Sequence, residues 1–150
     1  MKTYKPTSPS RRQMTTIEYD QLSKVDRFKS LTQGMSKAGG RNHHGRITMR
    51  HQGGGNKRVY RVVEFGQAKL NVPGRVETLE YDPYRTCFIA LVIYRDGNRR
   101  YILAAKELKV GDSVLVADSA PLTPSNRMRL KQIPIGYLVH NVELVPNGGG

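Results

Sequence analysis

The feature that most constrains this chain is a stretch without acidic residues, from Arg27 to Val63. It contains nine lysines and arginines, and residues 34–58 within it contain seven glycines. Such a segment has too little apolar surface to offset the conformational entropy that it loses on ordering. We therefore expect residues 1–57 to be mostly extended or irregular in isolation, apart from a modest helix or turn around Tyr19 to Leu31, and to order when their charges meet a partner.

The positive charge of the chain is concentrated in its N-terminal part. The 150 residues have a formal net charge of +13. Residues 1–66 contain 14 lysines and arginines against four acidic residues, a net of +10, and residues 67–150 contain 11 against eight, a net of +3. This distribution favours a polyanionic partner, nucleic acid before an anionic membrane. No transmembrane span or secretory signal is expected, and the single cysteine suits a reducing compartment.

The rest of the chain alternates between short β-branched or aromatic runs and tight turns. Strands are predicted at residues 59–65, 75–81, 86–95, 98–104, 113–117 and 136–145. The apolar run within 86–95 is typical of a buried central strand, and Asp96-Gly97 after it is a hairpin signal. These elements predict a mainly β fold, a small five-stranded OB-type barrel at residues 58–146 behind a basic, mostly irregular extension at 1–57. Residues 147–150 would begin a glycine-rich linker.

The histidines raise the question of a metal site. The available ligands are His43, His44, His51 and Cys87. Zinc sites use spaced pairs of cysteines or histidines, and the neighbouring arginines repel a cation, so no metal is expected. Gly40 to Gly45 has the spacing of a nucleotide-binding loop, but Arg46-Ile47 follows where that loop needs lysine and a hydroxyl residue. No cofactor or small-molecule substrate is predicted.

Catalysis is not predicted either. Cys87 belongs to an apolar run, where a thiol is usually an inert small side chain. His140 and Glu143 are three residues apart in a predicted strand and would therefore lie on opposite faces. Asp82 and Asp112 lie in predicted turns, where carboxylates cap the backbone. We expect no enzyme.

The pattern between Lys37 and Lys57 instead favours nucleic acid. Arginine matches phosphate and stacks on bases, and glycine lets the backbone approach closely. The alternative is a solvated basic tail, but here the cations are interleaved with glycine, histidine and asparagine instead of forming a lysine block. On these grounds the expected RNA contacts include Lys5, Arg11, Arg12, Lys37, His43, His44 and Arg61. Arg85, Arg99 and Arg100 are expected to add contacts from the barrel, with a merely solvated face as the alternative.

Several motifs resemble one protein family in their order along almost the whole chain. They are YKPTSP (4–9) with Arg11-Arg12, GGRNHHGRIT (39–48), RHQGGGNKRVYRVVEF (50–65), YDPYRTCFIALVIYRDGNRRYILA (81–104), LKVGD (108–112) and IPIGYLVHNVELVPNGGG (133–150). The chain resembles the N-terminal half of the universal large-subunit ribosomal protein number two family. That resemblance implies an extension that threads between RNA helices, followed by an OB-fold.

The resemblance also implies a function. Members of the family bind large-subunit ribosomal RNA, help organise the region around the peptidyl transferase centre and support association of the subunits. Carried onto this sequence, the RNA contacts are Arg41, Asn42, Arg46, Arg50, His51, Lys57 and Arg58. The family continues into an SH3-like barrel, which we expect a separate polypeptide of a split gene to supply, beside other large-subunit proteins. We expect a mitochondrial matrix ribosome, with bacterial cytoplasm and plastid as alternatives.

A single-strand-binding OB module acting off the ribosome is the alternative function. It requires aromatic side chains on the barrel face, on which bases can stack. The available rings include Tyr60, Tyr81, Tyr94 and Tyr101, of which several are expected in the core.

Overall fold

The computed structural model describes residues 1–66, 68–146 and 148–150 and shows a mainly β chain. Four antiparallel strands form the central sheet in the order β7-β6-β5-β8. Their bounds are Gly74–Glu80 (β5), Ile89–Tyr94 (β6), Arg99–Leu103 (β7) and Ser113–Val114 (β8).

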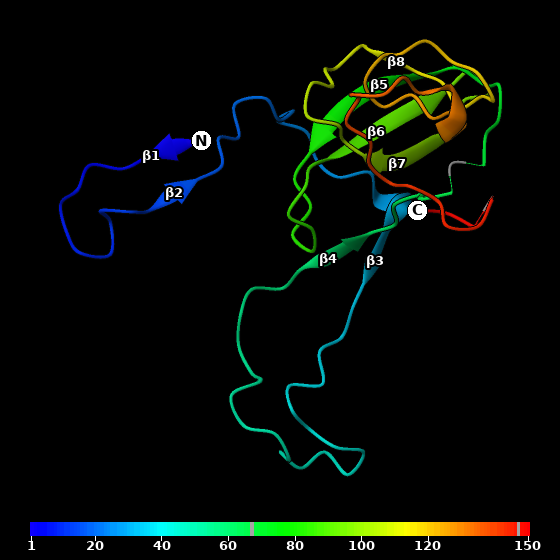
Figure 1. Ribbon diagram of the computed structural model, residues 1–150. Helices are drawn as coiled ribbons and strands as arrows, with labels where there is room; N and C mark the ends of the chain where they lie inside the picture. Colours follow the sequence, from blue (N-terminus) through cyan, green and yellow to red (C-terminus); the bar gives the residue numbers. More distant parts are fainter. Residues whose placement is uncertain (67, 147) are drawn as a thin grey trace.

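Two two-stranded ribbons project from the body that contains this sheet (Figure 1). The N-terminal ribbon pairs β1 (Lys2–Thr3) with β2 (Thr15–Thr16), and the second pairs β3 (Thr32–Gly34) with β4 (Val59–Arg61). Two 3-10 helices complete the described elements, η1 at Lys29–Leu31 and η2 at Leu130–Gln132. The helix or turn expected around Tyr19 to Leu31 is present in two places, as a turn in which the Leu22 amide donates to the Tyr19 carbonyl at 3.0 Å and as η1.

Strand β6 lies at the centre of the core because both of its faces are covered. Successive side chains of a strand point to opposite faces. Val92 and Tyr94 accordingly belong to one buried cluster, and Ile89 and Leu91 to another. The prediction of a buried central strand is confirmed. The hairpin at Asp96-Gly97 is also confirmed, with Gly97 at a φ of +81° that a side chain would disfavour.

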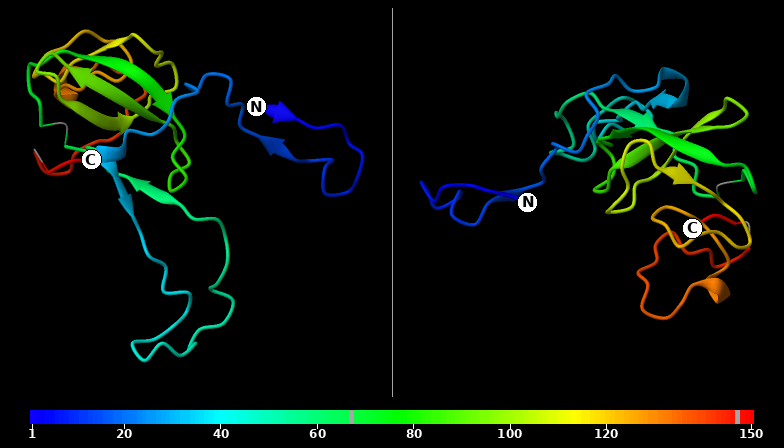
Figure 2. Two further views of the ribbon diagram at one scale, coloured as in Figure 1. Left: turned by 180° about the vertical axis from the view of Figure 1, so that it is seen from behind. Right: turned by 90° about the horizontal axis from the view of Figure 1, so that it is seen from above.

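The sheet curls into a half-barrel (Figure 2). Strand β5 has a register shift between Val76 and Thr78, and such a bulge bends a strand and increases its twist. Isolated bridges extend the two outer edges, Val63 beside Tyr101 and Val116 beside Arg127. The mainly β class and an OB-type fold are thereby confirmed, although the sheet itself has four strands.

The predicted strand at 136–145 is wrong, because these residues have an irregular backbone. A strand needs the free edge of a neighbour, whatever its own β propensity. Here Glu64 donates its amide to Tyr101 on one outer side, and Arg127 donates to Leu115 on the other. The prediction that Cys87 lies among apolar side chains is also wrong, since β6 begins only at Ile89 and the thiol is exposed.

The basic extension is anchored by a buried tyrosine. Tyr101 on β7 is fully buried, accepts a hydrogen bond from the amide of Phe28 at 2.9 Å and donates one to Glu80 Oε2 at 2.8 Å. Burial raises the pKa of Tyr101, so the phenol keeps the proton that it donates. Phe28 and Leu31 pack beside this site. Residues 28–31 of the extension thus pack against the folded body, and the division of the chain at residue 57 stays a prediction.

A second anchor lies in the turn after β5. Asp82 is fully buried, and Arg85 Nη1 donates a hydrogen bond to its Oδ2 at 2.5 Å. Arg85 Nη2 donates to the hydroxyl of Tyr60 on β4 at 2.9 Å, and the guanidinium lies 5.1 Å from the centre of the Tyr60 ring. We call Asp82, Arg85 and Tyr60 the root clamp. It joins the sheet to the strand at which the long loop returns.

Replacing Tyr101 by phenylalanine should destabilise the free protein by about 1–3 kcal/mol, because the Phe28 amide and Glu80 lose their partner in a buried place. Urea denaturation measures the free energy of unfolding. Tyr94→Phe is the matched control, since the buried Tyr94 hydroxyl has no hydrogen-bond partner among the described residues. Tyr94→Phe should leave the free energy of unfolding unchanged or raise it. Equal destabilisation by both variants would contradict the role of Tyr101 as an anchor.

Arg85→Ala should destabilise the free protein by about 3 kcal/mol, because it leaves the Asp82 carboxylate buried without its charge partner. Arg129→Ala removes the exposed pair with Asp118 and should cost less than about 1 kcal/mol. Thermal and urea unfolding of the two variants compare these effects. A destabilisation by Arg85→Ala no larger than that of the exposed pair would refute the root clamp.

Candidate nucleic-acid interface

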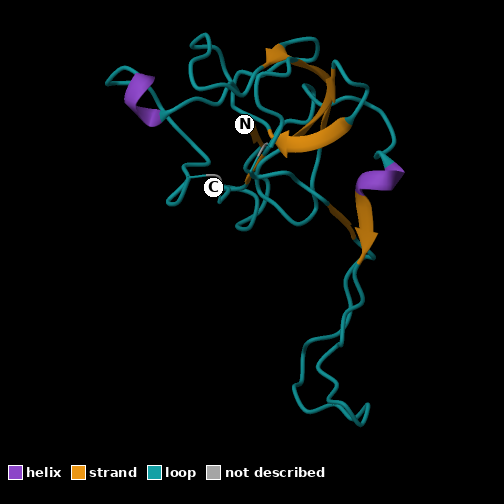
Figure 3. Cartoon of the chain, turned by 90° about the vertical axis from the view of Figure 1, so that its right-hand side faces the viewer, coloured by secondary structure: helices purple, strands orange, loops and turns teal. Residues whose placement is uncertain are grey.

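The loop between β3 and β4, residues 35–58, extends away from the sheet as a single limb (Figure 3). We call it the basic arm. Its residues are exposed except for Gly39, Gly40 and Asn42, which are half-buried within the arm itself. None of them belongs to either buried apolar cluster. The arm is therefore held by its own backbone hydrogen bonds and by its attachment to the sheet.

The positive charge of the basic arm is not compensated within the protein. Its cations, all of them sequence-predicted contacts, are Lys37, Arg41, Arg46, Arg50, Lys57 and Arg58. Seven ion pairs connect the described residues, and none includes a residue of the arm. Carboxylates are instead paired elsewhere, as between Glu77 and Arg99, whose hydrogen bonds lower the pKa of Glu77. The arm therefore presents a positive field to an anionic partner.

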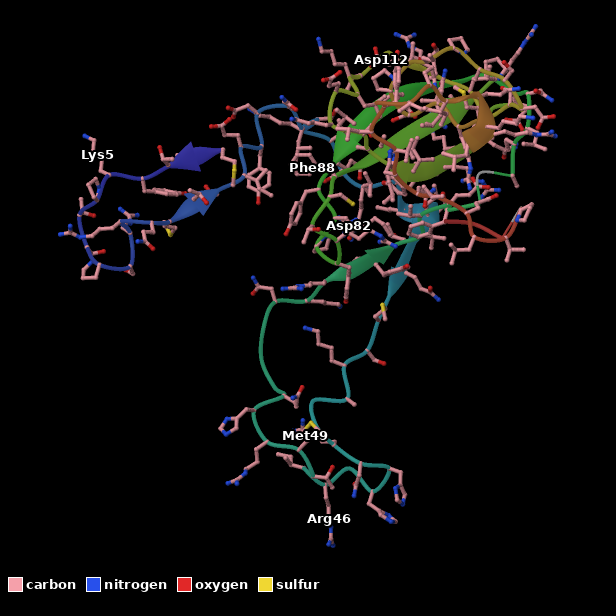
Figure 4. The ribbon with its side chains drawn as sticks, in the orientation of Figure 1. Lys5, Arg46, Met49, Asp82, Phe88 and Asp112 are labelled. Atoms are coloured by element: carbon pink, nitrogen blue, oxygen red, sulfur yellow. The ribbon has the colours of Figure 1, made fainter. Side chains whose placement is uncertain are left out.

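The tip of the arm is a defined turn. Asn42 Oδ1 accepts hydrogen bonds from the amides of His44 at 3.0 Å and Arg46 at 3.1 Å. The Asn42 amide donates to the carbonyl of Arg46, and Arg41 forms a bridge with Ile47. Asparagine commonly shapes turns in this way. The turn directs Arg46 to the end farthest from the sheet (Figure 4), and Asn42, predicted as an RNA contact, has its acceptor oxygen in use within the turn.

Gly40 holds the two sides of the arm together. Its carbonyl accepts the amides of Thr48 at 2.9 Å and Met49 at 3.1 Å. Its φ is +72°, and a Cβ would lie 2.1 Å from the carbonyl oxygen of Met49. A side chain at this position would therefore separate the two sides, so the close approach requires glycine.

The three histidines of the arm have different settings. His43 and His44 lie with their ring centres 3.7 Å apart and are exposed at the tip. His51 has a φ of +62°, which is uncommon for a residue other than glycine. The described residues include no group of three or more His, Cys, Asp or Glu side chains placed to hold a metal ion. The His43 and His44 side chains are exposed, and their contact with RNA stays a prediction.

The other predicted contacts of the extension lie on a separate limb. Lys5, Arg11 and Arg12 are exposed around the turn between β1 and β2. The Arg11 guanidinium lies 5.5 Å from the centre of the Tyr4 ring, and the Tyr4 hydroxyl contacts Thr16 at 3.1 Å. Lys5 and Arg46 lie far apart on different limbs (Figure 4). The extension therefore presents two basic limbs and not one continuous strip.

The arginines at the root of the arm are engaged with the protein. Arg58 donates to the carbonyl of Pro83 at 3.2 Å, and Arg61 donates to that of Val59 at 2.6 Å. Arg85 belongs to the root clamp. The structure brings these three predicted contacts together, but it occupies part of their donor capacity. They position the arm, and their contact with RNA stays a prediction.

Two further predicted contacts lie on β7. Arg99 forms two hydrogen bonds with Glu77, at 2.7 and 3.1 Å, and its guanidinium lies 5.4 Å from the centre of the Phe28 ring. Arg100 is 3.7 Å from Glu64. Both side chains are partly exposed, and both are paired with acids, unlike the cations of the arm.

Sequence reasoning did not single out Thr48 and Met49, which face Lys37 to Arg41 from the returning side of the arm. Together with Gln52 they line a hollow opposite Gly39 and Gly40. One signal was available, since Ile47 and Met49 are large apolar residues in a loop that has no core. Their exposures are 61% and 60%.

In the part of the chain that the structure describes, no helix has both the length and the apolar surface needed to cross a membrane.

A family model and individual relatives both match this chain to the same protein family. Residues 28–116 match the family model described as ribosomal proteins L2, RNA binding N-terminal domain. Proteins named large ribosomal subunit protein uL2 are similar to the chain, with 51% identity over 149 residues in Hyphomonas neptunium and 50% over 150 residues in Rhodospirillum rubrum. The relative from Agrobacterium fabrum is 52% identical over 151 residues.

These alignments cover 99–100% of this chain and 54% of each relative. The chain thus spans about half the length of the curated relatives that it matches. The family match starts at Phe28, the residue whose amide is bound by Tyr101. On this match, the chain belongs to the ribosomal protein L2 family and contains its N-terminal domain.

Proposed function

We propose that the chain is a structural constituent of the large ribosomal subunit and that its basic arm binds large-subunit ribosomal RNA. The observation that carries this proposal is the uncompensated charge of residues 35–58 on a limb fixed to a folded body. Relatives named as large-subunit proteins support it. No catalytic step is part of this function.

The mechanism is electrostatic and conformational. Lysines and arginines of the arm replace counterions condensed on the RNA, so affinity falls steeply as salt rises. The glycines bring the backbone close to phosphates and 2′-hydroxyl groups, which report the shape of RNA more than its base sequence. Lys5, Arg11 and Arg12 form a second contact from the N-terminal ribbon, and Arg99 and Arg100 contact RNA from the body. In the assembled particle, the arm helps organise RNA around the peptidyl transferase centre.

Because it is attached at its root, the arm should bind RNA more tightly than a free basic tail with the same charge. Tyr101 fixes the outgoing chain through Phe28, and the root clamp fixes the returning chain through Tyr60. Two fixed ends reduce the conformational freedom that the arm must lose on binding. The folded body therefore sets the direction from which the arm enters the RNA.

A protein partner is proposed for the segment 133–146. Ile135, Leu138 and Leu144 have exposures of 106%, 101% and 97%. Large apolar side chains that are fully exposed within one short segment suit an interaction with a partner. We propose that a separate polypeptide of a split gene covers them and supplies the SH3-like half, beside other large-subunit proteins. Residues 148–150 would lead toward it, and residue 147 of the expected 147–150 linker lies outside the described residues.

The compartment that we propose is the mitochondrial matrix, with bacterial cytoplasm and plastid as alternatives. The similarity to proteins from bacteria supports a ribosome of the bacterial type.

The four tyrosines considered for the single-strand-binding alternative do not present free ring faces together on the described barrel. Tyr94 and Tyr101 are buried, and Tyr60 is held in the root clamp. Tyr81 is 49% exposed, but its ring packs edge-on against Tyr19 at 5.7 Å. Stacking platforms need free ring faces.

Replacing Arg41 and Arg46 together by alanine should weaken binding to large-subunit ribosomal RNA. The slope of log K against log salt should become shallower by about 0.7–0.9 for each phosphate that the variant no longer neutralises. Filter binding over a salt series measures both quantities. Unfolding of the free protein should be unchanged, because neither side chain contacts the core.

The matched control replaces Lys106 and Lys109, two exposed cations of the body, by alanine. It makes the same change in net charge and should alter the affinity much less. Equal losses of affinity in the two double variants would show that binding depends on net charge alone and not on the position of the charges in the arm.

A further inference from the structure

The basic arm contains a hollow that its role as a charged limb does not explain. The hollow has a volume of about 520 Å³ and opens to solvent between the two sides of the arm. Lys37, Gly39, Gly40 and Arg41 line it from the outgoing side, and Met49 and Gln52 from the returning side. Small-molecule sites on proteins fall in the same range of volume. A single nucleotide matches this size, whereas an RNA duplex does not.

The shape of the hollow is set by backbone contacts. Thr48 and Met49 donate their amides to Gly40, which closes the hollow at its tip end. Gly39 and Gly40 have φ values of +61° and +72° and expose their peptide groups to this wall, where Arg41 Nη1 donates to the Gly39 carbonyl at 3.4 Å. Lys37 reaches toward the opposite side, where its Nζ would lie 3.8 Å from a Cβ at Gly55. The hollow therefore exists without any packing from the sheet.

The side chains around the hollow match the chemistry of a nucleotide. The Met49 thioether is apolar and polarisable, and such groups contact aromatic rings favourably. The Gln52 amide has donors and an acceptor, as the edge of a base requires. Lys37 and Arg41 have positive charges for a phosphate, and no ion pair of the described residues uses them. A purely electrostatic contact would need only the cations.

We propose that this hollow binds one unpaired nucleotide of the large-subunit ribosomal RNA, its base against Met49 and Gln52 and its phosphate against Lys37 and Arg41. The inference rests on the proposed function, since it specifies what the basic arm recognises. Proteins recognise RNA sequence chiefly through unpaired bases, which are splayed out of the helix. The arm then makes one selective contact within a largely shape-dependent interface.

The test uses the full chain, transcribed large-subunit ribosomal RNA and a neutral double variant, Met49→Ala with Gln52→Ala. Removing the side chains that hold the base should raise the dissociation constant about tenfold. The slope of log K against log salt should stay the same, because no charge is removed. Chemical probing of base edges should show one nucleotide that is no longer protected. Met49→Leu, which keeps an apolar side chain, should retain wild-type binding.

The matched control is Ile47→Ala with Asn56→Ala, which removes one apolar side chain and one amide of the arm outside the hollow. It should change the dissociation constant less than about twofold. If the Met49 and Gln52 variant keeps wild-type affinity and wild-type protection, the hollow proposal is overturned and the proposed function stands. If the unaltered chain fails to bind this RNA, both are overturned.

Discussion

The structure depends on one constraint, a run of positive charge that no acidic residue within it compensates. From Arg27 to Val63 the chain has nine cations and no carboxylate. The acids of the body are paired beside the sheet, as Glu77 is with Arg99 and Asp82 with Arg85. Folding the arm back onto the body would bring like charges together and bury little apolar surface. An extended arm is the arrangement that the composition permits.

An arm without a core still needs a fixed direction, and buried polar contacts at its root provide one. Tyr101 is central, because one hydroxyl joins the Phe28 amide to Glu80 on β5. The root clamp adds a charged pair in which the carboxylate is completely buried. Buried polar groups are costly unless they are satisfied. Each anchor therefore tolerates few alternative geometries, which restricts the orientation of the limb.

Much of the fold was predictable from the sequence where a signal is local. The run IALVIY identified the central strand, and Asp96-Gly97 identified the turn after it. The segment 136–145 has equal β propensity but no free edge to join, and a single segment contains no information about edges. Cys87 was misjudged because the apolar run starts two residues before β6 does.

For the site, the sequence located the basic arm but did not show which residues shape it and which are exposed for binding. Composition indicated that the cations of residues 35–58 share one segment, and that segment is exposed. It did not distinguish Arg46, which reaches outward, from Arg85, whose guanidinium binds Asp82 and Tyr60. It also did not show that Asn42 shapes the tip turn, or that Met49 and Gln52 face Lys37 across a hollow. The Arg85–Tyr60 contact and the hollow join residues that lie far apart in the sequence, whereas the Asn42 turn is local.

The central claim is that the basic arm enters ribosomal RNA while the body fixes its root. A density map of the native particle that contains this chain tests it most directly. The account predicts residues 35–58 surrounded by large-subunit RNA, with the Tyr101–Phe28 contact and the root clamp intact. An arm that lies in solvent, or a chain absent from large-subunit particles and bound to free single strands, would contradict it.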